Sequence, residues 1–332
     1  MTRPTAPRRR IVGALLSLAA LGAASPAAAQ PAAWPSKPIR MVIPFPAGGA
    51  TDVLGRVVAQ RLSTALGQQV IVENRPGAGG SIGADTVAKA PPDGHVILMS
   101  TSSTHSIGPA LNPKMPYDAQ KDFVPVAHVA TAPNVLVVGS NFPASDARQM
   151  VALLKSNPGR YNFGSSGIGT IPHLSAELFK WQGGNLFAVH IPYRGTGLVI
   201  PDLIAGQIAF LMDSVVTAAP HVRDGKLKAL AVTGTRRSGA MPEVATFAEQ
   251  GVPGMDAATW FGLFVPAGTP AAIVQRLNEE SNAMLRSPDV VDRLAKLGAD
   301  PAGGSPEAFA RVVRGDYEKW AAVIRRAGIK PE

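Results

Sequence analysis

The 332-residue sequence contains no cysteine, which excludes disulfides, thiolate nucleophiles and thiolate metal ligands. Its six histidines show none of the His-x-x-x-His or His-Glu-x-x-His spacings of metal sites, so we predict no metal and no cofactor. No apolar run reaches the roughly 20 residues that a membrane-spanning helix needs. Charged residues are also scarce, at 17%, against 46% hydrophobic residues. Such a composition indicates a compact protein with a large core, and the length suits two domains.

The first 29 residues have the layout of a secretory signal peptide. Three arginines at positions 8–10 precede a short apolar run over residues 11–21, and Ala27-Ala28-Ala29 offers a cleavage site of small residues. The arginines loosely fit a twin-arginine signal but lack its fuller consensus, so general secretion is favoured, and we expect a protein exported to the periplasm. This segment holds four arginines and no acid, so its removal lowers the formal net charge from +9 by four, to +5. The remaining basic residues are scattered, which predicts neither a nucleic-acid nor a membrane partner.

The stretch 39–66 predicts a strand, a glycine loop and a helix in succession. Residues 39–45 are rich in β-branched side chains and bounded by prolines, whereas apolar residues from Leu54 onward recur at helical spacing. Between them, residues 47–50 are only glycine and alanine, so a ligand can approach their backbone N–H groups, and Thr51 or Asp52 is expected to cap the helix. A helix start attracts a carboxylate or a phosphate. The alternative is an ordinary strand-to-helix turn whose glycines only tighten the chain.

The rest of the chain alternates strands and helices, which predicts an open α/β fold with parallel sheets. Two extended runs without a helix between them, 123–130 and 134–138, fit a crossing between two lobes, and residues 260–265 fit a strand that returns to the first lobe. In such sheets ligands bind beyond the carboxyl ends of the strands. Further strands are expected at 69–73, 95–100, 161–164, 187–192, 208–213 and 229–233, and helix starts at Ser145, Thr170, Thr269-Pro270 and Ser305.

Two glycine- or serine-rich loops, 45–52 and 165–170, are predicted at helix starts that face each other. Each would present backbone donors and hydroxyls to an anion, and charge-assisted hydrogen bonds to a carboxylate are the stronger kind. Two such loops across a cleft match a ligand with two acidic groups, or with one acidic group and a polar tail, and closure of the lobes around it would be a hinge motion. We place the first lobe at 34–131 plus 246–332 and the second at 132–245.

Residues at the predicted strand and helix ends complete the candidate site. Asp213 would lie beside the cleft, although its neighbourhood also suits capping of the next helix at Ser214. His173 would either point at the ligand or only cover its loop, and the structural role is favoured. Arg194 is equally well explained as a solvated charge at the rim. The candidate ligand-binding residues are Phe45, Ala47, Gly48, Gly49, Thr51, Asp52, Asn74, Thr101, Ser165, Ser166, Gly167, Thr170, His173, Tyr193 and Asp213.

Enzymatic motifs are incomplete in this sequence. Gly77-Ala78-Gly79 would need a glycine in place of Ile82 to form a dinucleotide fingerprint, and residues 164–167 would need one in place of Ile168 to form a nucleophile elbow. We therefore expect a binding protein and no enzyme. A serine hydrolase whose residues meet only in space stays open as an alternative. It would use Ser165 or Ser166 as nucleophile, His173 or His105 as base, and Asp52 or Asp213 as the third member.

Taken together, the motifs resemble those of the substrate-binding proteins of tripartite tricarboxylate transporters, the Bug-type periplasmic receptors, over essentially the whole mature length. The matching segments are Trp-Pro-Ser-Lys-Pro-Ile at 34–39, Pro-Phe-Pro-Ala-Gly-Gly-Ala-Thr-Asp at 44–52, Glu-Asn-Arg-Pro-Gly-Ala-Gly-Gly at 73–80, Phe-Gly-Ser-Ser-Gly at 163–167, Pro-Tyr-Arg-Gly at 192–195, Asp-Leu-Ile-Ala-Gly-Gln at 202–207 and Pro-Ala-Gly-Thr-Pro at 266–270.

The resemblance implies a two-lobe, type II-like periplasmic-binding fold without catalysis. The implied ligand is a small organic carboxylate, either a di- or tricarboxylate or an aromatic acid, held by the 45–52 loop at one end and the 165–170 loop at the other. The implied partners are the integral membrane subunits of the transporter, with the receptor itself a monomer, and Asp213 takes the place of the family's strand-end aspartate. A receptor that serves a membrane sensor without transport is a further alternative.

The chain departs from the family's usual pattern in three places. Leu198-Val199-Ile200 replaces a stretch usually richer in alanine and proline, Ala209 stands where an acid is common, and Ala245 stands where proline is common. If residues 198–200 border the cleft, a bulkier or more apolar ligand is expected.

Overall fold

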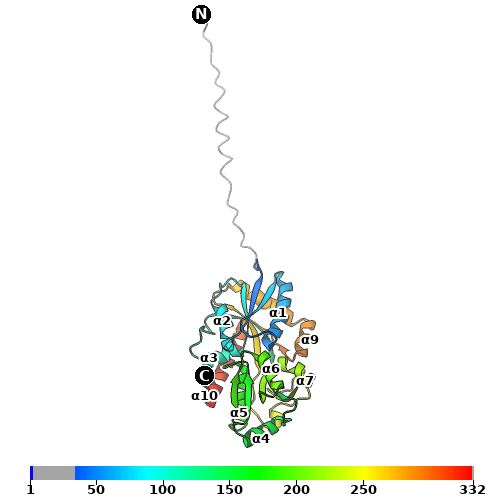
Figure 1. The fold of residues 1–332 in the computed structure, drawn as a ribbon. Helices are drawn as coiled ribbons and strands as arrows, with labels where there is room; N and C mark the ends of the chain where they lie inside the picture. Colours follow the sequence, from blue (N-terminus) through cyan, green and yellow to red (C-terminus); the bar gives the residue numbers. More distant parts are fainter. Residues whose placement is uncertain (3–33, 331–332) are drawn as a thin grey trace.

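The structure, a computed structural model, describes residues 1–2 and 34–330. Apart from its first two residues, the predicted signal peptide (1–29) lies outside the described residues. The described chain forms two lobes, one above the other in Figure 1, and each lobe is built around its own β-sheet. The predicted α/β class and two-lobe architecture are thereby confirmed.

The first sheet consists of β1 (Ile39–Ile43), β2 (Val70–Asn74), β3 (Val96–Thr101), β4 (Phe123–Ala132), β10 (Thr259–Pro266) and β11 (Asp300–Pro301). Their order across the sheet is β11-β4-β10-β3-β1-β2. β1 runs parallel to β2 and β3, as predicted. β4, β10 and β11 run antiparallel to their neighbours, so this sheet is mixed and the prediction of a parallel sheet is correct only for β1, β2 and β3.

The second sheet consists of β5 (Asn134–Gly139), β6 (Asn162–Ser165), β7 (Val189–Pro192), β8 (Phe210–Ser214) and β9 (Leu227–Val232). Their order is β7-β6-β8-β5-β9, with β6 parallel to β7 and β8, and β5 antiparallel to β8 and β9. β4 and β5 follow each other in the chain but belong to different sheets, and β10 belongs to the first. The predicted crossing and the predicted return strand are therefore both confirmed.

Helices pack on the sheets because the strands are apolar on both faces. In β1, for example, Ile39 and Met41 belong to the core formed with Leu54 of the first helix, whereas Val42 belongs to the core that contains Phe264. The helices are α1 (Ala50–Leu66), α2 (Ser81–Ala88), α3 (Gly108–Leu111), α4 (Ala147–Ser156), α5 (Ile171–Gln182), α6 (Thr196–Ile204), α7 (Val215–Arg223), α8 (Ala271–Leu285), α9 (Pro288–Lys296) and α10 (Pro306–Ala327), with a π-helical turn at Ser103–Ile107 and 3-10 turns at Ala78–Gly80 and Ala248–Gln250.

The predicted helix starts are correct in part. Ser305 caps α10, because its side chain accepts a hydrogen bond from the backbone N–H of Ala308, and Thr170 occupies the N-cap of α5. At α4 the cap is Asp146, which accepts from Gln149, so the choice of Ser145 is wrong. α1 already begins at Ala50, so Thr51 and Asp52 lie inside its first turn and neither caps it. α8 begins at Ala271 with Pro270 at its N-cap.

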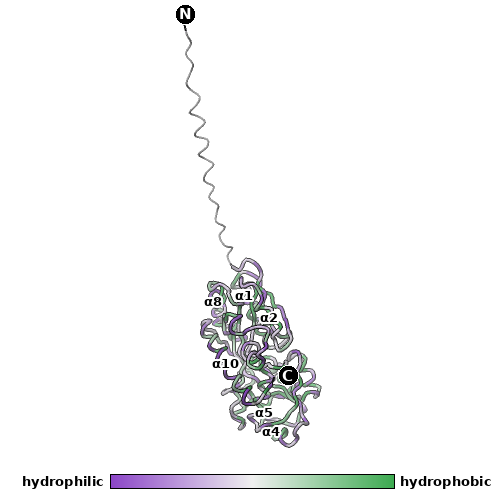
Figure 2. The backbone as a smooth tube through the Cα atoms, turned by 90° about the vertical axis from the view of Figure 1, so that its left-hand side faces the viewer, coloured by the Kyte–Doolittle hydropathy of each residue, from purple (hydrophilic) through white to green (hydrophobic). Residues whose placement is uncertain are grey.

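The last helix contacts both lobes. Phe309 and Val313 of α10 pack in a core of the first lobe, whereas Trp320 and Ile324 pack in a core of the second. Figure 2 shows the lobes turned by 90°, with α1, α2 and α8 in one lobe, α4 and α5 in the other, and α10 labelled near the level where they meet. The lobe boundaries at 131/132 and 245/246 stay a prediction. Residues of the 247–257 stretch, which were assigned to the first lobe, pack in the core of the second. In the described part of the chain, no helix is both long and apolar enough to span a membrane.

Candidate functional site

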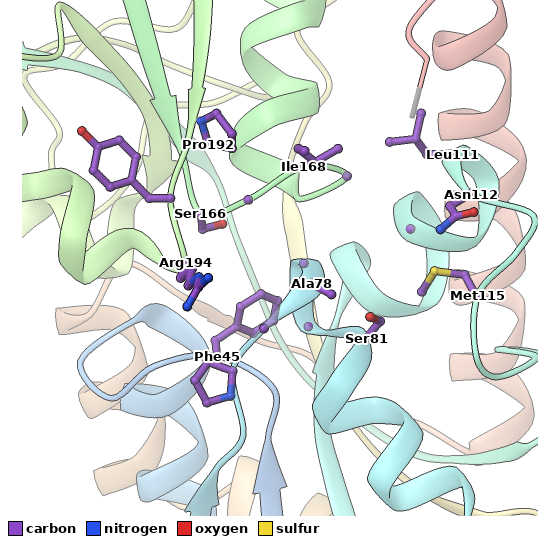
Figure 3. A pocket seen from close by; sticks show the side chains of 18 of the residues that line it. Phe45, Ala78, Ser81, Leu111, Asn112, Met115, Ser166, Ile168, Pro192 and Arg194 are labelled. Carbon is purple, nitrogen blue, oxygen red and sulfur yellow. The ribbon is translucent and has the colours of Figure 1, made fainter. Parts of the chain in front are cut away.

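Two neighbouring cavities lie where the lobes meet. An inner cavity of about 40 Å³ and an outer cavity of about 400 Å³ share Phe45, Pro46 and Ser166 in their walls, so they are parts of one cleft. Figure 3 shows the outer cavity, with Phe45 and Arg194 on one side and Leu111 on the other. The inner cavity is lined by Phe45, Pro46, Gly49, Ala50, Thr51, Thr101, Ser103, Ser166, Ile171, Pro172, Thr196, Gly197, Asp213, Ser214, Thr259 and Phe261.

Four helices begin at the wall of the inner cavity. They are α1 of the first lobe and α5, α6 and α7 of the second, and each contributes its N-cap or first-turn residues to the lining. The first N–H groups of a helix have no intrahelical partner, and the helix start carries about half a positive charge. None of the described residues that line this cavity is a lysine, an arginine or a histidine. An anion placed there would therefore be held by helix starts and hydroxyl groups, without a cationic side chain.

Asp213 supplies the only carboxylate of the inner cavity among the described residues. It stands near the end of β8 with 3% of its surface exposed, and it accepts a hydrogen bond of 2.5 Å from Thr217 Oγ1. Burial raises the pKa of the Asp213 carboxyl to about 7, although hydrogen bonds from Thr217 and Ser214 lower it in part. Capping of α7 falls to Ser214, whose Oγ accepts from the N–H of Val216, so Asp213 is not the cap.

A network of side chains holds the 45–52 loop from behind. Asp52 accepts hydrogen bonds from Gly48 N (3.0 Å), Arg56 Nε (3.0 Å) and Asn74 Nδ2 (2.9 Å). Asn74 Nδ2 also donates to the carbonyl of Phe45 at 3.0 Å. Burial alone would raise the pKa of Asp52, but these hydrogen bonds outweigh it and lower that pKa. Polar atoms of Gly48, Asp52 and Asn74 therefore bind one another, and the expectation that these residues contact a ligand stays a prediction.

The 165–170 loop is fixed mainly by its own hydrogen bonds. Ser165 Oγ accepts from Gly167 N at 3.1 Å, and Thr170 Oγ1 donates to the carbonyl of Gly167 at 2.6 Å. Ser165 and Thr170 are fully buried and line neither cavity, whereas Ser166 lines both. The two predicted hydroxyls therefore shape the loop, and Ser166 is the hydroxyl of this loop that a ligand can reach.

His173 supports the same loop from within the second lobe. Its Nδ1 accepts from Gly169 N at 3.2 Å, and its ring stacks on that of His190 with the centroids 4.0 Å apart. Burial, together with His190 and Lys180, lowers the pKa of His173 to about 3, so the ring is neutral. His173 lines neither cavity, which fits the structural role favoured from the sequence, and its place among the candidate ligand contacts stays a prediction.

Tyr193 and Arg194 border the outer cavity. The Tyr193 hydroxyl donates to Asp202 Oδ2 at 2.6 Å, and burial and this carboxylate raise the pKa of Tyr193 to about 12. The Tyr193 hydroxyl thus serves the second lobe, whereas the guanidinium of Arg194 is exposed at the rim of the cleft near Phe45 and Ser166 (Figure 3).

The two lobes touch each other directly around the cleft. The N–H of Ile171 in the second lobe donates to Ser103 Oγ in the first at 3.0 Å. A Cβ atom added to Gly79 would lie 2.7 Å from the carbonyl oxygen of Ile168, and one added to Gly195 would lie 2.3 Å from the ring of a facing proline. Both distances are well below ordinary contact, so the closed arrangement requires glycine at these two positions.

Some of the predicted site residues line the two cavities and others do not, and the cavities also contain residues that the sequence prediction missed. Signals for the missed positions were partly present: Gly195-Thr196 follows a strand and opens a helix, as Gly49-Ala50 does, whereas nothing local marks Ser103 or Phe261. Predicted residues in the inner cavity are Phe45, Gly49, Thr51, Thr101, Ser166 and Asp213, those in the outer cavity also include Gly167 and Tyr193, and those in neither are Ala47, Gly48, Asp52, Asn74, Ser165, Thr170 and His173.

The unusual 198–200 segment belongs to the core of the second lobe. Val199 is fully buried and would meet a Cβ added to Gly164 at 2.4 Å, Ile200 is 8% exposed, and Leu198 faces solvent. None of the three lines either cavity, so the segment changes packing and not the space for ligand.

The hydrolase alternative lacks an accessible serine paired with a candidate base among the described residues, because Ser166 lines both cavities but forms no hydrogen bond with His173 or His105. Ser165 lies 2.7 Å from His190 Nε2, but it is fully buried and outside both cavities. His105, the other candidate base, contacts Ser100 and Thr104 and not Ser165 or Ser166. The described residues also contain no cluster of three or more metal-ligating side chains.

Two α/β lobes joined by crossing strands, with helix starts from both lobes around one cleft, define a two-lobe solute-binding protein. Residues 54–329 match the family described as "Tripartite tricarboxylate transporter family receptor". The chain belongs to this family, as its motifs predicted. The family is one of receptors, which supports a binding protein and not the hydrolase.

Relatives are similar over almost the whole chain. The "UPF0065 protein in tcbD-tcbE intergenic region" of a Pseudomonas species is 41% identical over 96% of this chain and 94% of its own length, and BugT of Bordetella pertussis is 38% identical over 94% and 95%. Among solved structures, an R. palustris protein with adipate is 36% identical with a TM-score of 0.88, over 90% of this chain and 100% of its own. MatC from Rhodopseudomonas palustris, with bound malate, is 34% identical with a TM-score of 0.84, over 88% and 100%.

Proposed function

We propose that this protein is a periplasmic receptor that captures a small organic carboxylate and delivers it to the integral membrane subunits of a tripartite tricarboxylate-type transporter. The observation that carries the proposal is the convergence of four helix starts on a small cavity between the lobes, with no cationic side chain among the described lining residues. Helix starts and hydroxyls suit a carboxylate because they offer several N–H and O–H donors without requiring a fixed counter-charge.

The two cavities divide the ligand between them. The inner cavity, of about 40 Å³, accommodates a group of only a few atoms, such as one carboxylate. The outer cavity, of about 400 Å³, takes the rest of the molecule against Leu111, Met115 and Ile168, with Arg194 at the rim for a second acidic group. This division favours a di- or tricarboxylate with an aliphatic chain, or an aromatic acid, over a very small acid such as acetate.

The ligands bound by two relatives of known structure support this class. Proteins that are 36% and 34% identical to this chain were solved with adipate and with malate, which are both dicarboxylates of different length. The ligand enters while the lobes are apart, and its contacts to both lobes then stabilise the closed form. In the remaining part of the proposal, the N-terminal 29 residues direct export and the mature receptor acts as a monomer.

The proposal is tested by a thermal-shift screen of the mature protein against aliphatic di- and tricarboxylates, aromatic acids and acidic amino acids. A ligand at a hundred times its dissociation constant adds about 2.7 kcal/mol of stability, which raises the melting temperature measurably. A selective rise with one class of acid supports the proposal and identifies the substrate class. An unchanged melting temperature with every acid tested would argue against a carboxylate receptor.

A further inference from the structure

The inner cavity contains a carboxyl group of the protein where the proposed ligand would place another. Asp213 is 3% exposed there, and its partners among the described residues are the hydroxyl of Thr217 and the backbone of Ser214. The cavity is so small that a ligand carboxylate inside it would come within a few ångströms of Asp213. Two ionised carboxylates at such a distance, away from water, repel each other strongly.

We propose that Asp213 carries a proton when the ligand is bound and donates it in a hydrogen bond to the ligand's carboxylate, so that the receptor takes up a proton as it binds. This inference rests on the proposed function, because it requires a carboxylate in the inner cavity. The shared proton removes one of the two negative charges and forms an O–H···O⁻ bond, which is short and strong. The same arrangement lets paired carboxyl groups share one proton in other proteins.

The charged side chains on the surrounding elements do not neutralise Asp213 and the ligand's carboxylate. The neighbouring strands β3, β5, β6 and β10 carry no titratable side chain. The titratable side chains on the surrounding helices are His173, Glu177 and Lys180 of α5, Asp202 of α6, His221 and Arg223 in the last turn of α7, Asp52, Arg56 and Arg61 of α1, and His105 of the Ser103–Ile107 turn.

None of these groups contributes a charge at Asp213, whose pKa is shifted by burial, Thr217 and Ser214. His173 is engaged with Gly169, Lys180 with Glu177, and Asp52 with Arg56. Helix starts stabilise the one negative charge that the bound pair retains.

The protonation state of the free protein makes this uptake accessible near neutral pH. Burial raises the pKa of Asp213 to about 7, so the carboxyl is protonated in about half of the molecules at that pH. Below pH 7 the proton is already present and binding is tightest. Above pH 7 each molecule must first take up a proton, so the observed affinity falls about tenfold for each further pH unit.

The test uses adipate and malate as probes in titration calorimetry of the mature protein between pH 6 and pH 8.5, in phosphate and in Tris. We expect binding of either probe to weaken about 30-fold across this range and the difference in heat between the two buffers to show uptake of up to one proton at the alkaline end. Asp213→Asn carries a neutral side chain that cannot ionise, so this variant should bind either probe with no pH dependence and no proton uptake. Circular dichroism establishes that the variant folds, and the proton count on the wild type needs no variant.

Several outcomes would overturn the inference. Binding that is equally tight at all pH values refutes the shared proton and leaves the proposed function standing. Binding that strengthens as pH rises, with loss of binding in Asp213→Asn, would show that an ionised Asp213 accepts from a donor group of the ligand. Failure of both probes to bind at any pH counts against dicarboxylates in this cleft, and so against the proposed function and this inference together.

Discussion

Substitution of Gly79 by alanine tests whether ligand affinity depends on full closure of the lobes. The added Cβ would lie 2.7 Å from the carbonyl oxygen of Ile168, and an ordinary contact of 3.4 Å requires the two lobes to separate by about 0.7 Å. The same displacement would stretch the hydrogen bond from Ile171 N to Ser103 Oγ from 3.0 Å to about 3.7 Å, beyond hydrogen-bonding distance.

The expected loss of affinity follows from these contacts. The interlobe hydrogen bond contributes about 1 kcal/mol, and the ligand's own bonds to the two lobes lengthen together with it. We therefore expect Gly79→Ala to weaken binding at least about tenfold, since 1.4 kcal/mol corresponds to a factor of ten. Titration calorimetry with the acid found in the thermal-shift screen measures this change.

Gly67→Ala is the matched control for backbone strain. Gly67 has φ +67 and Gly79 has φ +65, but a Cβ at Gly67 would meet no atom within 4 Å. Both variants should lose about 1 kcal/mol of stability because alanine is strained at positive φ, and only Gly79→Ala should lose affinity. Equal affinity in the two variants, or equal loss in both, would refute the argument from closure.

Three further predictions concern single side chains. Ser103→Ala removes the interlobe acceptor for Ile171 N and should weaken ligand binding about fivefold without lowering the melting temperature of the free protein; unchanged affinity would mean that this bond does not contribute to closure. Asn74→Ala removes the hydrogen bonds that Asn74 donates to the carbonyl of Phe45 and to Asp52, so chemical denaturation should show a loss of about 1–3 kcal/mol, and a variant as stable as the wild type would contradict the network described for the 45–52 loop. Burial raises the pKa of Asp213 to about 7 in the folded protein, so its contribution to folding stability is full below about pH 4 and is lost as pH rises to about 7. The melting temperature of Asp213→Asn should therefore fall less over this range than that of the wild type, and parallel pH profiles would show that Asp213 is not protonated in the folded protein.

The sequence was sufficient to predict the lobes because their signals are local. The apolar runs of β1 and β3, the helix stop at Gly67 and the helix start at Ser305 depend on neighbouring residues only. The direction of a strand is not local. β10 runs antiparallel because the chain enters the first sheet from the other lobe, and no property of residues 259–266 encodes this.

The site was predictable at the level of loops and not of atoms. The glycines at 48 and 49 mark a loop beside the cleft, but which N–H groups are available depends on Asp52, which accepts from Gly48 N–H, and on Asn74, which donates to the carbonyl of Phe45 and fixes the loop. Ser165 and Ser166 are adjacent and chemically identical, and only the fold decides that Ser165 is buried and Ser166 faces the cavities.

The unequal distribution of helix starts around the inner cavity has a consequence for release. One of the four, α1, belongs to the first lobe, and α5, α6 and α7 belong to the second, together with Asp213. When the lobes separate, we expect the carboxylate to stay with the second lobe, which keeps most of the donors, and to lose only its bonds to the first. The membrane subunits would then collect cargo from one half of an open receptor, with no salt bridge to break at the inner carboxylate. Cross-linking of the ligand-loaded, open receptor to these subunits should accordingly map the handover to the second lobe.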